Sequence, residues 1–182
     1  MTLLNNPFVP SGYIAPEYFC DRERETEELL RWLVNENNVA IISTRRMGKT
    51  GLIQHCFHLK EIKENYYTFL IDIYATKTLR EFVFQLGKVI LATLKPKGQK
   101  AWELFVNSLV SLKAGFSLDM SGMPQWNLEL GDIKSPETTL DEIFHYLAVS
   151  DKPCIIAIDE FQQVAQYPEK NTEALLRTYV QH

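Results

Sequence analysis

Long apolar runs and paired cysteines are both missing from this sequence. No apolar run approaches the roughly 18 residues that a membrane span needs, and the first ten residues, MTLLNNPFVP, lack the basic start and apolar core of a signal peptide. The three cysteines, Cys20, Cys56 and Cys154, are far apart and form no C-x-x-C motif. They indicate buried thiols in a reducing compartment rather than a disulfide framework. We therefore expect a cytoplasmic protein that does not contact membranes.

An excess of basic residues is also absent. The 182 residues include 19 Lys and Arg against 23 Asp and Glu, which gives a net charge of -4, so nucleic acid is not indicated as a partner. The share of hydrophobic residues, 46%, is ordinary for a chain long enough to form a domain with its own core. Residues 1–20, rich in proline and aromatic residues, are expected to be extended, and 21–182 to form one domain.

The apolar pattern predicts alternating strands and helices. Three short runs rich in β-branched or aromatic residues predict strands: VAIIS at 39–43, YYTFLIDIY at 66–74 and CIIAIDE at 154–160. Apolar residues at helical spacing predict helices at about 21–34, 52–60, 78–95, 102–112, 139–149 and after 171. Asp21 is the expected N-cap of the first helix, and Thr78 and Glu81 are expected to form a capping box for the third. His55 and His58, on the second, are expected to be ordinary surface or partly buried histidines. Residues 115–130 alternate polar and apolar around a central turn, which predicts an inserted β-hairpin. Together the elements predict an α/β fold.

The stretch STRRMGKT, residues 43–50, follows the first predicted strand and precedes a predicted helix. A phosphate-binding loop has the pattern G-x-x-x-x-G-K-[ST]; Gly48, Lys49 and Thr50 match it, but Ser43 replaces the first glycine. A bare G-K-[ST] occurs by chance in about one chain in ten of this length, so the strand-loop-helix context carries the prediction. Serine costs about 1 kcal/mol at this position if the backbone needs a glycine-like conformation.

Two carboxylates lie at the end of the third predicted strand. Apolar residues lead directly into Asp159 and Glu160, at the carboxyl end of a buried strand, where open α/β sheets bind ligands. For this pair alone, a strand that simply stops at its first charged residue is an equal alternative. The G-K-T loop about 110 residues earlier in the chain shifts the balance toward a nucleotide site.

The two groups together predict how phosphates and a metal ion are held. Backbone N–H groups at the start of a helix cradle the β-phosphate; the candidate cofactor-binding residues are Arg45, Arg46, Met47, Gly48, Lys49, Thr50 and Gly51. Lys49 reaches the β and γ oxygens, and Thr50 supplies a hydroxyl ligand to Mg²⁺. Asp159 holds that ion through its waters. Glu160 is the candidate general base, and Lys49 the second candidate catalytic residue.

The pairing of strand-STRRMGKT-helix with CIIAIDE resembles the additional-strand, catalytic-glutamate division of P-loop NTPases, and more narrowly the archaeal-type AAA-like ATPases near the STAND group. Three more matches support the resemblance: FCDRERETEELLRWL at 19–33 is similar to the family's F-x-x-R-E-x-E segment, two arginines precede x-G-K-T, and DEFQ at 159–162 is similar to its extended acid motif. The resemblance covers nearly the whole chain. It implies a three-layer P-loop fold with a mostly parallel sheet, ATP and Mg²⁺ as cofactors, and Tyr18 to Arg22 beside the adenine.

The resemblance also implies what the 182 residues lack. In the family, a sensor strand lies between the Walker A and Walker B strands, and that strand, a helical lid and an arginine finger are not found in this sequence. The chain is thus expected to be truncated at its C-terminus, and inactive alone. In a longer switch or motor protein it would bind ATP and hydrolyse it with Mg²⁺. Its partner would be the missing C-terminal region or another protein.

Two other functions stay open at this point. A P-loop phosphotransferase acting on a small molecule is one, although such enzymes usually lack an acid like Glu160 at the strand end. The other is an interaction domain that keeps the fold and binds nucleotide weakly or not at all; Ser43 and the missing C-terminal elements count in its favour.

Overall fold

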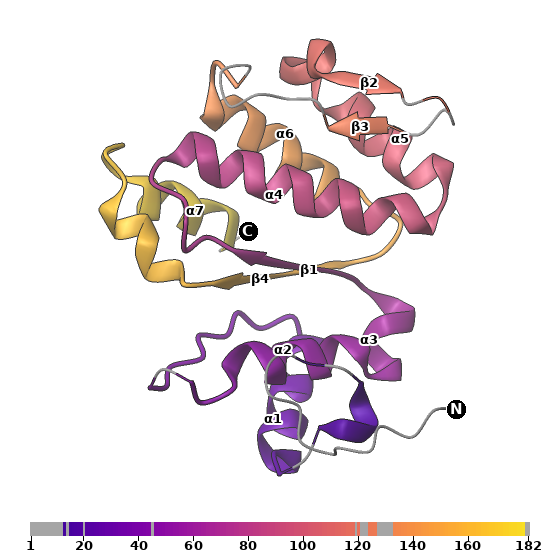
Figure 1. Ribbon diagram of the computed structural model, residues 1–182, viewed down its shortest axis with the longest axis vertical. Coiled ribbons are helices and arrows are strands. Elements are labelled where there is room, and N and C mark those ends of the chain that lie inside the picture. The colour runs from indigo at the N-terminus through magenta and orange to yellow at the C-terminus, as the bar shows by residue number, and fades with distance from the viewer. Residues whose placement is uncertain are drawn as a thin grey trace. The chain divides into compact units, whose positions relative to one another are not determined.

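The computed structural model describes residues 13, 15–19, 21–44, 46–118, 120, 124–126 and 133–180. In this part of the chain most residues lie in helices, and strands pair in two small sheets, β1 with β4 and β2 with β3 (Figure 1). The fold is therefore α/β, as the sequence pattern predicted. Contacts within the chain define two compact units, Met1–Thr68 and Phe69–His182.

The described part of unit 1 contains short helices. They are η1, a 3₁₀ helix (Pro16–Tyr18), α1 (Glu23–Val34), α2 (Lys49–His58) and α3 (Lys60–Asn65). The 3₁₀ turn replaces the extended chain expected there, because Pro16 stands in its first turn, where proline is well tolerated. The expectation that Asp21 caps α1 is also wrong: Arg22 holds the N-cap position, and Asp21 has a φ of 69°, outside the extended range that N-cap residues adopt.

Helices α1 and α2 form the core of unit 1. Leu29, Leu52 and Cys56 are buried, and Phe19, Leu33 and Ile41 pack against them. Cys56 is fully buried, and burial raises the pKa of its thiol to about 11. It is therefore a core residue, as the scattered cysteines predicted; Cys20 lies outside the described residues.

The predicted strand at 39–43 does not form. These residues have no regular structure, Ile42 is 92% exposed and Val39 is 43% exposed. A buried strand needs hydrogen-bonded neighbours and apolar cover on both faces, and no described strand pairs with this segment. The sequence prediction is wrong here because an apolar composition does not by itself supply those neighbours.

Unit 2 is built around the pairing of β1 with β4. The elements in chain order are β1 (Tyr67–Asp72), which begins at the boundary, α4 (Leu79–Leu94), η2 (Lys95–Lys97), α5 (Gln99–Ser108), η3 (Val110–Gly115), β2 (Phe116–Leu118), β3 (Pro124–Trp126), α6 (Pro136–Ala148), β4 (Cys154–Asp159), η5 (Phe161–Gln166) and α7 (Thr172–Val180). The strands β1 and β4 are parallel, and the helices between them form the crossover that parallel strands require (Figure 1). The strands expected at 66–74 and 154–160 are confirmed.

One face of this strand pair is covered by helices, and the core of unit 2 lies between them. Phe69, Ile71 and Ile73 are fully buried, as are Phe82, Leu86 and Ile90 of α4. Figure 1 shows α4 and α6 over the same face of β1 and β4. Each fully buried side chain of this size contributes about 1.5–3 kcal/mol through removal from water, so this layer stabilises unit 2.

The predicted capping box at the start of α4 is present. The backbone N–H of Glu81 donates to Thr78 Oγ1 at 3.2 Å, and the Glu81 carboxylate accepts from the backbone N–H of Lys77. The reciprocal bond thus goes to the residue before the cap rather than to the cap itself. Two orphan N–H groups are satisfied in this way.

The predicted hairpin is confirmed where the structure describes it. Strands β2 and β3 pair antiparallel, with Phe116 opposite Trp126 and Leu118 opposite Pro124. The turn at 121–123 and the residues 127–130 lie outside the described residues. β4 differs from expectation in one respect: all six of its residues are half-buried, where a strand buried on both faces was predicted.

Replacing Ile90 by alanine is expected to lower the free energy of unfolding by about 2–5 kcal/mol, because the side chain is fully buried and leaves a cavity. Urea denaturation measures the change. The matched control is Lys88→Ala on the same helix, which is exposed and is expected to change stability by no more than about 0.5 kcal/mol. Equal effects of the two substitutions would contradict this packing.

Candidate functional site

The G-K-T segment of unit 1 lies at the start of α2. The helix begins at Lys49, and Gly48 is its N-cap residue, with a φ of 70° and a ψ of 25°. The first N–H groups of a helix have no partner within the helix, and the helix dipole places partial positive charge at this end. Lys49, Thr50 and Gly51 therefore form the first turn of a ten-residue helix whose N-terminus suits an anion.

Serine at position 43 carries no backbone strain. The left-handed conformations of this loop are found at Arg46, with a φ of 63°, and at Gly48; Ser43, which is also described, does not adopt one. Its hydroxyl donates to the carbonyl oxygen of Thr44 at 3.3 Å. The glycine missing from the motif is thus not required by the backbone conformation of this loop.

Lys49 folds back over the beginning of the loop. Its Nζ atom lies 3.2 Å from the carbonyl oxygen of Ser43 and 3.4 Å from that of Thr44. On the other side, the Arg22 guanidinium donates to the carbonyl oxygen of Met47. Two cations therefore bind carbonyl groups of the loop, and one of them is the predicted phosphate-binding lysine.

The acidic pair of unit 2 lies where predicted, at the carboxyl end of β4. Asp159 is the last residue of the strand, and Glu160 follows it as the N-cap of η5. Glu160 has a φ of 59° and a ψ of 35°, a left-handed conformation that is uncommon for a residue other than glycine. The Glu160 N–H donates to Asp159 Oδ1 at 3.0 Å. Such outliers are found often at functional sites.

Hydrogen bonds fix this turn against the neighbouring strand. Ile73 N–H donates to the carbonyl oxygen of Asp159 at 3.3 Å, and the Gln163 side chain donates to the carbonyl oxygen of Tyr74 at 2.7 Å. The Gln162 side chain donates to Glu160 Oε2. The Glu160 carboxylate is therefore held by a neighbour at its own end of the sheet rather than directed freely into solvent.

Sequence analysis missed several of these contacts. The sequence carries no signal for the bond from Gln163 to Tyr74, since the two residues are 89 positions apart. Gln162 and Arg22 do stand within the segments DEFQ and F-x-x-R-E-x-E, but those patterns gave no partner for either side chain. Asp72, whose Oδ1 accepts the Tyr74 N–H at 2.8 Å, was not a candidate either.

The candidate residues belong to two different units. Arg46 to Gly51 lie in unit 1, whereas Asp159 and Glu160 lie in unit 2; Arg45 lies outside the described residues. Within the described residues, no three His, Cys, Asp or Glu side chains form a group that could hold a metal ion. The pairing of Thr50 with Asp159 as metal ligands is part of the proposal below.

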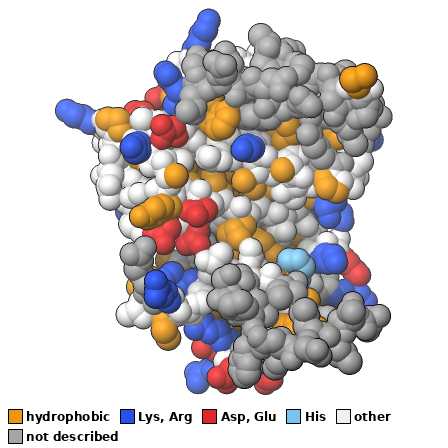
Figure 2. Space-filling model, in the orientation of Figure 1, with side chains coloured by type: hydrophobic (Ala, Val, Ile, Leu, Met, Phe, Trp, Pro, Cys, Tyr) orange, Lys and Arg blue, Asp and Glu red, His pale blue; other side chains and the backbone are white. Residues whose placement is uncertain are grey.

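On the described part of the face that Figure 2 shows, acidic and basic side chains are interspersed. Among the described helices, none is both long and apolar enough to cross a membrane.

No protein-family model, curated protein or solved structure matches this chain. A function for this chain must therefore be inferred from its own residues and their geometry.

Opposite effects are expected when glycine replaces Arg46 or Ser43. Arg46→Gly relieves a left-handed residue and is expected to stabilise the loop by up to about 1 kcal/mol, whereas Ser43→Gly only adds freedom to the unfolded chain and destabilises it by about 0.4–1 kcal/mol. Hydrogen exchange of the α2 amides measures both. Stabilisation by Ser43→Gly would show that position 43 is the strained one.

Proposed function

We propose that this chain is an AAA-like P-loop module that binds ATP and Mg²⁺ through residues 43–51. The observation that carries the proposal is the geometry of Lys49, at the first position of α2, with its ammonium folded over the carbonyl oxygens of Ser43 and Thr44. The β and γ oxygens of a nucleotide are stronger acceptors than these carbonyls, because they carry charge. They would take over the ammonium while the helix N-terminus binds the same phosphates.

The strand-end acids supply the second half of the proposed site. Thr50 and Asp159 would hold Mg²⁺, the latter through water, and Glu160 would accept a proton from the attacking water. In support, Asp159 and Glu160 stand at the carboxyl end of a parallel strand, where open α/β sheets bind ligands, and hydrogen bonds join this end to Ile73 and Tyr74, which follow β1. Hydrolysis is proposed for an assembly in which another chain or segment supplies an arginine finger.

A second candidate function has one observation of its own. Ile42 and Val39 are exposed in an irregular, apolar segment directly before the loop, and exposed apolar segments favour association with another polypeptide. An interaction domain that binds nucleotide weakly would also fit this surface. The binding experiment below separates the two, because an interaction domain does not require Lys49.

Lys49→Ala is expected to lower ATP affinity about 100-fold or more, because hydrogen bonds to charged groups contribute about 1.5–3 kcal/mol each and Lys49 would make more than one. Isothermal titration calorimetry with ATP, ADP and GTP, with and without Mg²⁺, measures the effect. Lys60→Ala is the matched control, because Lys60 is exposed at the start of α3 and its substitution also removes one positive charge. ATP affinity that Lys49→Ala leaves unchanged would refute the phosphate-loop assignment.

Glu160→Gln is expected to keep ATP affinity and to slow phosphate release by about 10²–10⁴-fold, since the amide keeps the shape of the side chain but cannot accept a proton. Phosphate release is followed in an assembly that turns over ATP. Gln166→Glu, an exposed change at the end of η5, serves as the charge control. Normal turnover by Glu160→Gln would make the acidic pair a strand terminus without a catalytic role.

A further inference from the structure

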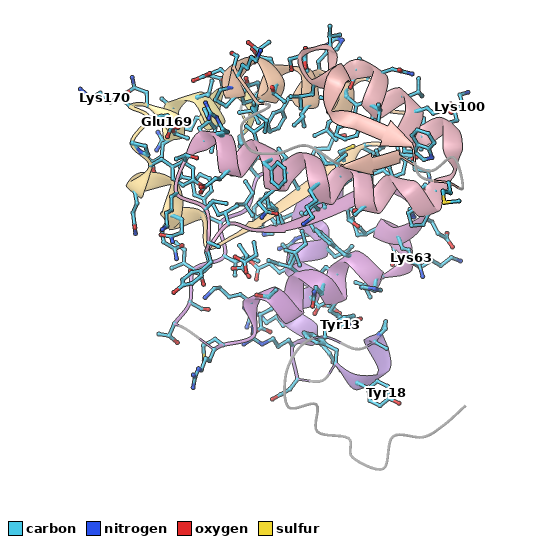
Figure 3. All side chains as sticks on the ribbon, turned by 45° about the horizontal axis from the view of Figure 1, so that its top comes forward. Tyr13, Tyr18, Lys63, Lys100, Glu169 and Lys170 are labelled. Carbon is cyan, nitrogen blue, oxygen red and sulfur yellow. The ribbon has the colours of Figure 1, made fainter. Side chains whose placement is uncertain are left out.

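Four rings from the N-terminal segment and from α2 meet in unit 1. Phe19 stacks on His55, with ring centroids 4.1 Å apart and 13° between the planes. The Tyr13 ring lies 5.0 Å from the His58 ring and 5.8 Å from the His55 ring. The Tyr13 hydroxyl is 3.3 Å from His55 Nδ1, and Figure 3 shows Tyr13 beside α2. His58 is exposed and His55 is half-buried, as expected for surface or partly buried histidines, and His55 is the centre of this cluster.

The cluster touches the helix turn that carries the candidate phosphate-binding residues. A side-chain carbon at Gly51 would lie 3.8 Å from Cε2 of Phe19, which is ordinary contact distance. Phe19 also packs against the core formed by Leu29, Leu52 and Cys56. His55 lies one turn further along α2. The position of Phe19 near the first turn of α2 therefore depends on its stacking against the His55 ring.

The charge state of His55 decides how well this packing holds. Burial lowers the pKa of His55, and the neighbouring His58 lowers it further. Among the described side chains, the rings of Tyr13 and Phe19 contact His55, and α1 packs against α2 through Thr26, Leu29 and Leu33. None of these is a carboxylate that would stabilise an imidazolium.

The direction of the effect follows from linkage. A histidine whose pKa is lower in the packed state binds protons more readily once it is released, so the packing is most stable above the ordinary value of about 6.5 and weakens as the pH falls through that value. An imidazolium on a ring face also gains cation–π attraction, which acts in the opposite sense. Burial of the His55 ring and the charge of His58 both act against protonation of the packed His55.

We propose that neutral His55 is a positioning residue for the phosphate loop: stacked on Phe19 and bonded to Tyr13, it holds the N-terminal segment against α2 through these two rings, and its protonation releases that segment and weakens nucleotide binding. The link to nucleotide rests on the proposed function. The release of the segment does not, because it depends only on contacts within unit 1.

NMR tests the release directly in the full chain. Between pH 8 and pH 5.5, we expect the ring signals of Phe19 and Tyr13 to move together with the His55 titration, and the cross-relaxation between the Phe19 and His55 rings to be lost. His58→Gln removes the like charge and is expected to shift this transition to higher pH. Cross-relaxation that persists when His55 is protonated would overturn the proposal.

ATP affinity at pH 7.5 and 5.8 tests the link to the loop. The γ-phosphate of ATP also titrates in this range, so the change in the wild type must be compared with that in a variant. The variant is His55→Phe, which keeps a stacking ring but cannot titrate. We expect acidification to weaken wild-type binding several-fold more than it weakens binding by His55→Phe. His145→Gln, an exposed histidine of α6, is the control and is expected to behave like the wild type.

The outcomes are distinguishable. Equal loss of affinity in the wild type and His55→Phe would remove the link to the loop. A chain that binds no ATP at either pH would refute the proposed function, while the NMR titration would still decide whether His55 holds the segment. If His55→Phe does not fold, His58→Gln replaces it in the comparison. Because its transition lies at higher pH, acidification is then expected to weaken ATP binding more in the variant than in the wild type.

Discussion

The parallel pairing of β1 with β4 is the long-range constraint on which unit 2 depends. It joins residues more than 80 positions apart, and Ile73 and Asp159 share a backbone hydrogen bond at its carboxyl end. The intervening chain must cross over between two parallel strands, and its helices bury one face of the pair. Everything proposed for Asp159 and Glu160 depends on this edge, because the turn that follows β4 is fixed by bonds to the end of β1.

A different constraint shapes unit 1. Gly48 in a left-handed conformation begins α2 directly at Lys49, so the lysine, the threonine and the first N–H groups of the helix lie within one turn. The packing of α2 against α1 through Leu29, Leu52 and Cys56 holds that turn in place. Phe19 and His55 extend the same contact toward the N-terminal segment. The proposed effect of charge on His55 would reach the loop through these side-chain contacts.

Two residues at the candidate sites, neither of them glycine, have left-handed backbone conformations that glycine would adopt more easily. Arg46 and Glu160 both adopt left-handed conformations, which cost a residue other than glycine roughly 1 kcal/mol. Each stands in the segment where chemistry is proposed, one in the loop and one beside the strand-end aspartate. Strain of this kind persists only when the surrounding bonds hold the residue there, as Asp159, Gln162 and Gln163 do for Glu160.

The sequence by itself determined those elements whose signals are local. Helical spacing placed α1, α4 and α6, the alternation around 115–130 placed the hairpin, and the Thr78–Glu81 pattern placed the cap of α4. Other features could be seen only in the tertiary structure: the backbone conformation of Ser43, the absence of a strand at 39–43, and the hydrogen bonds of Gln162 and Gln163 around Glu160. The reason is physical: spacing along the chain records which face of an element is apolar, whereas strand partners, backbone strain and side-chain hydrogen bonds depend on residues that only folding brings together.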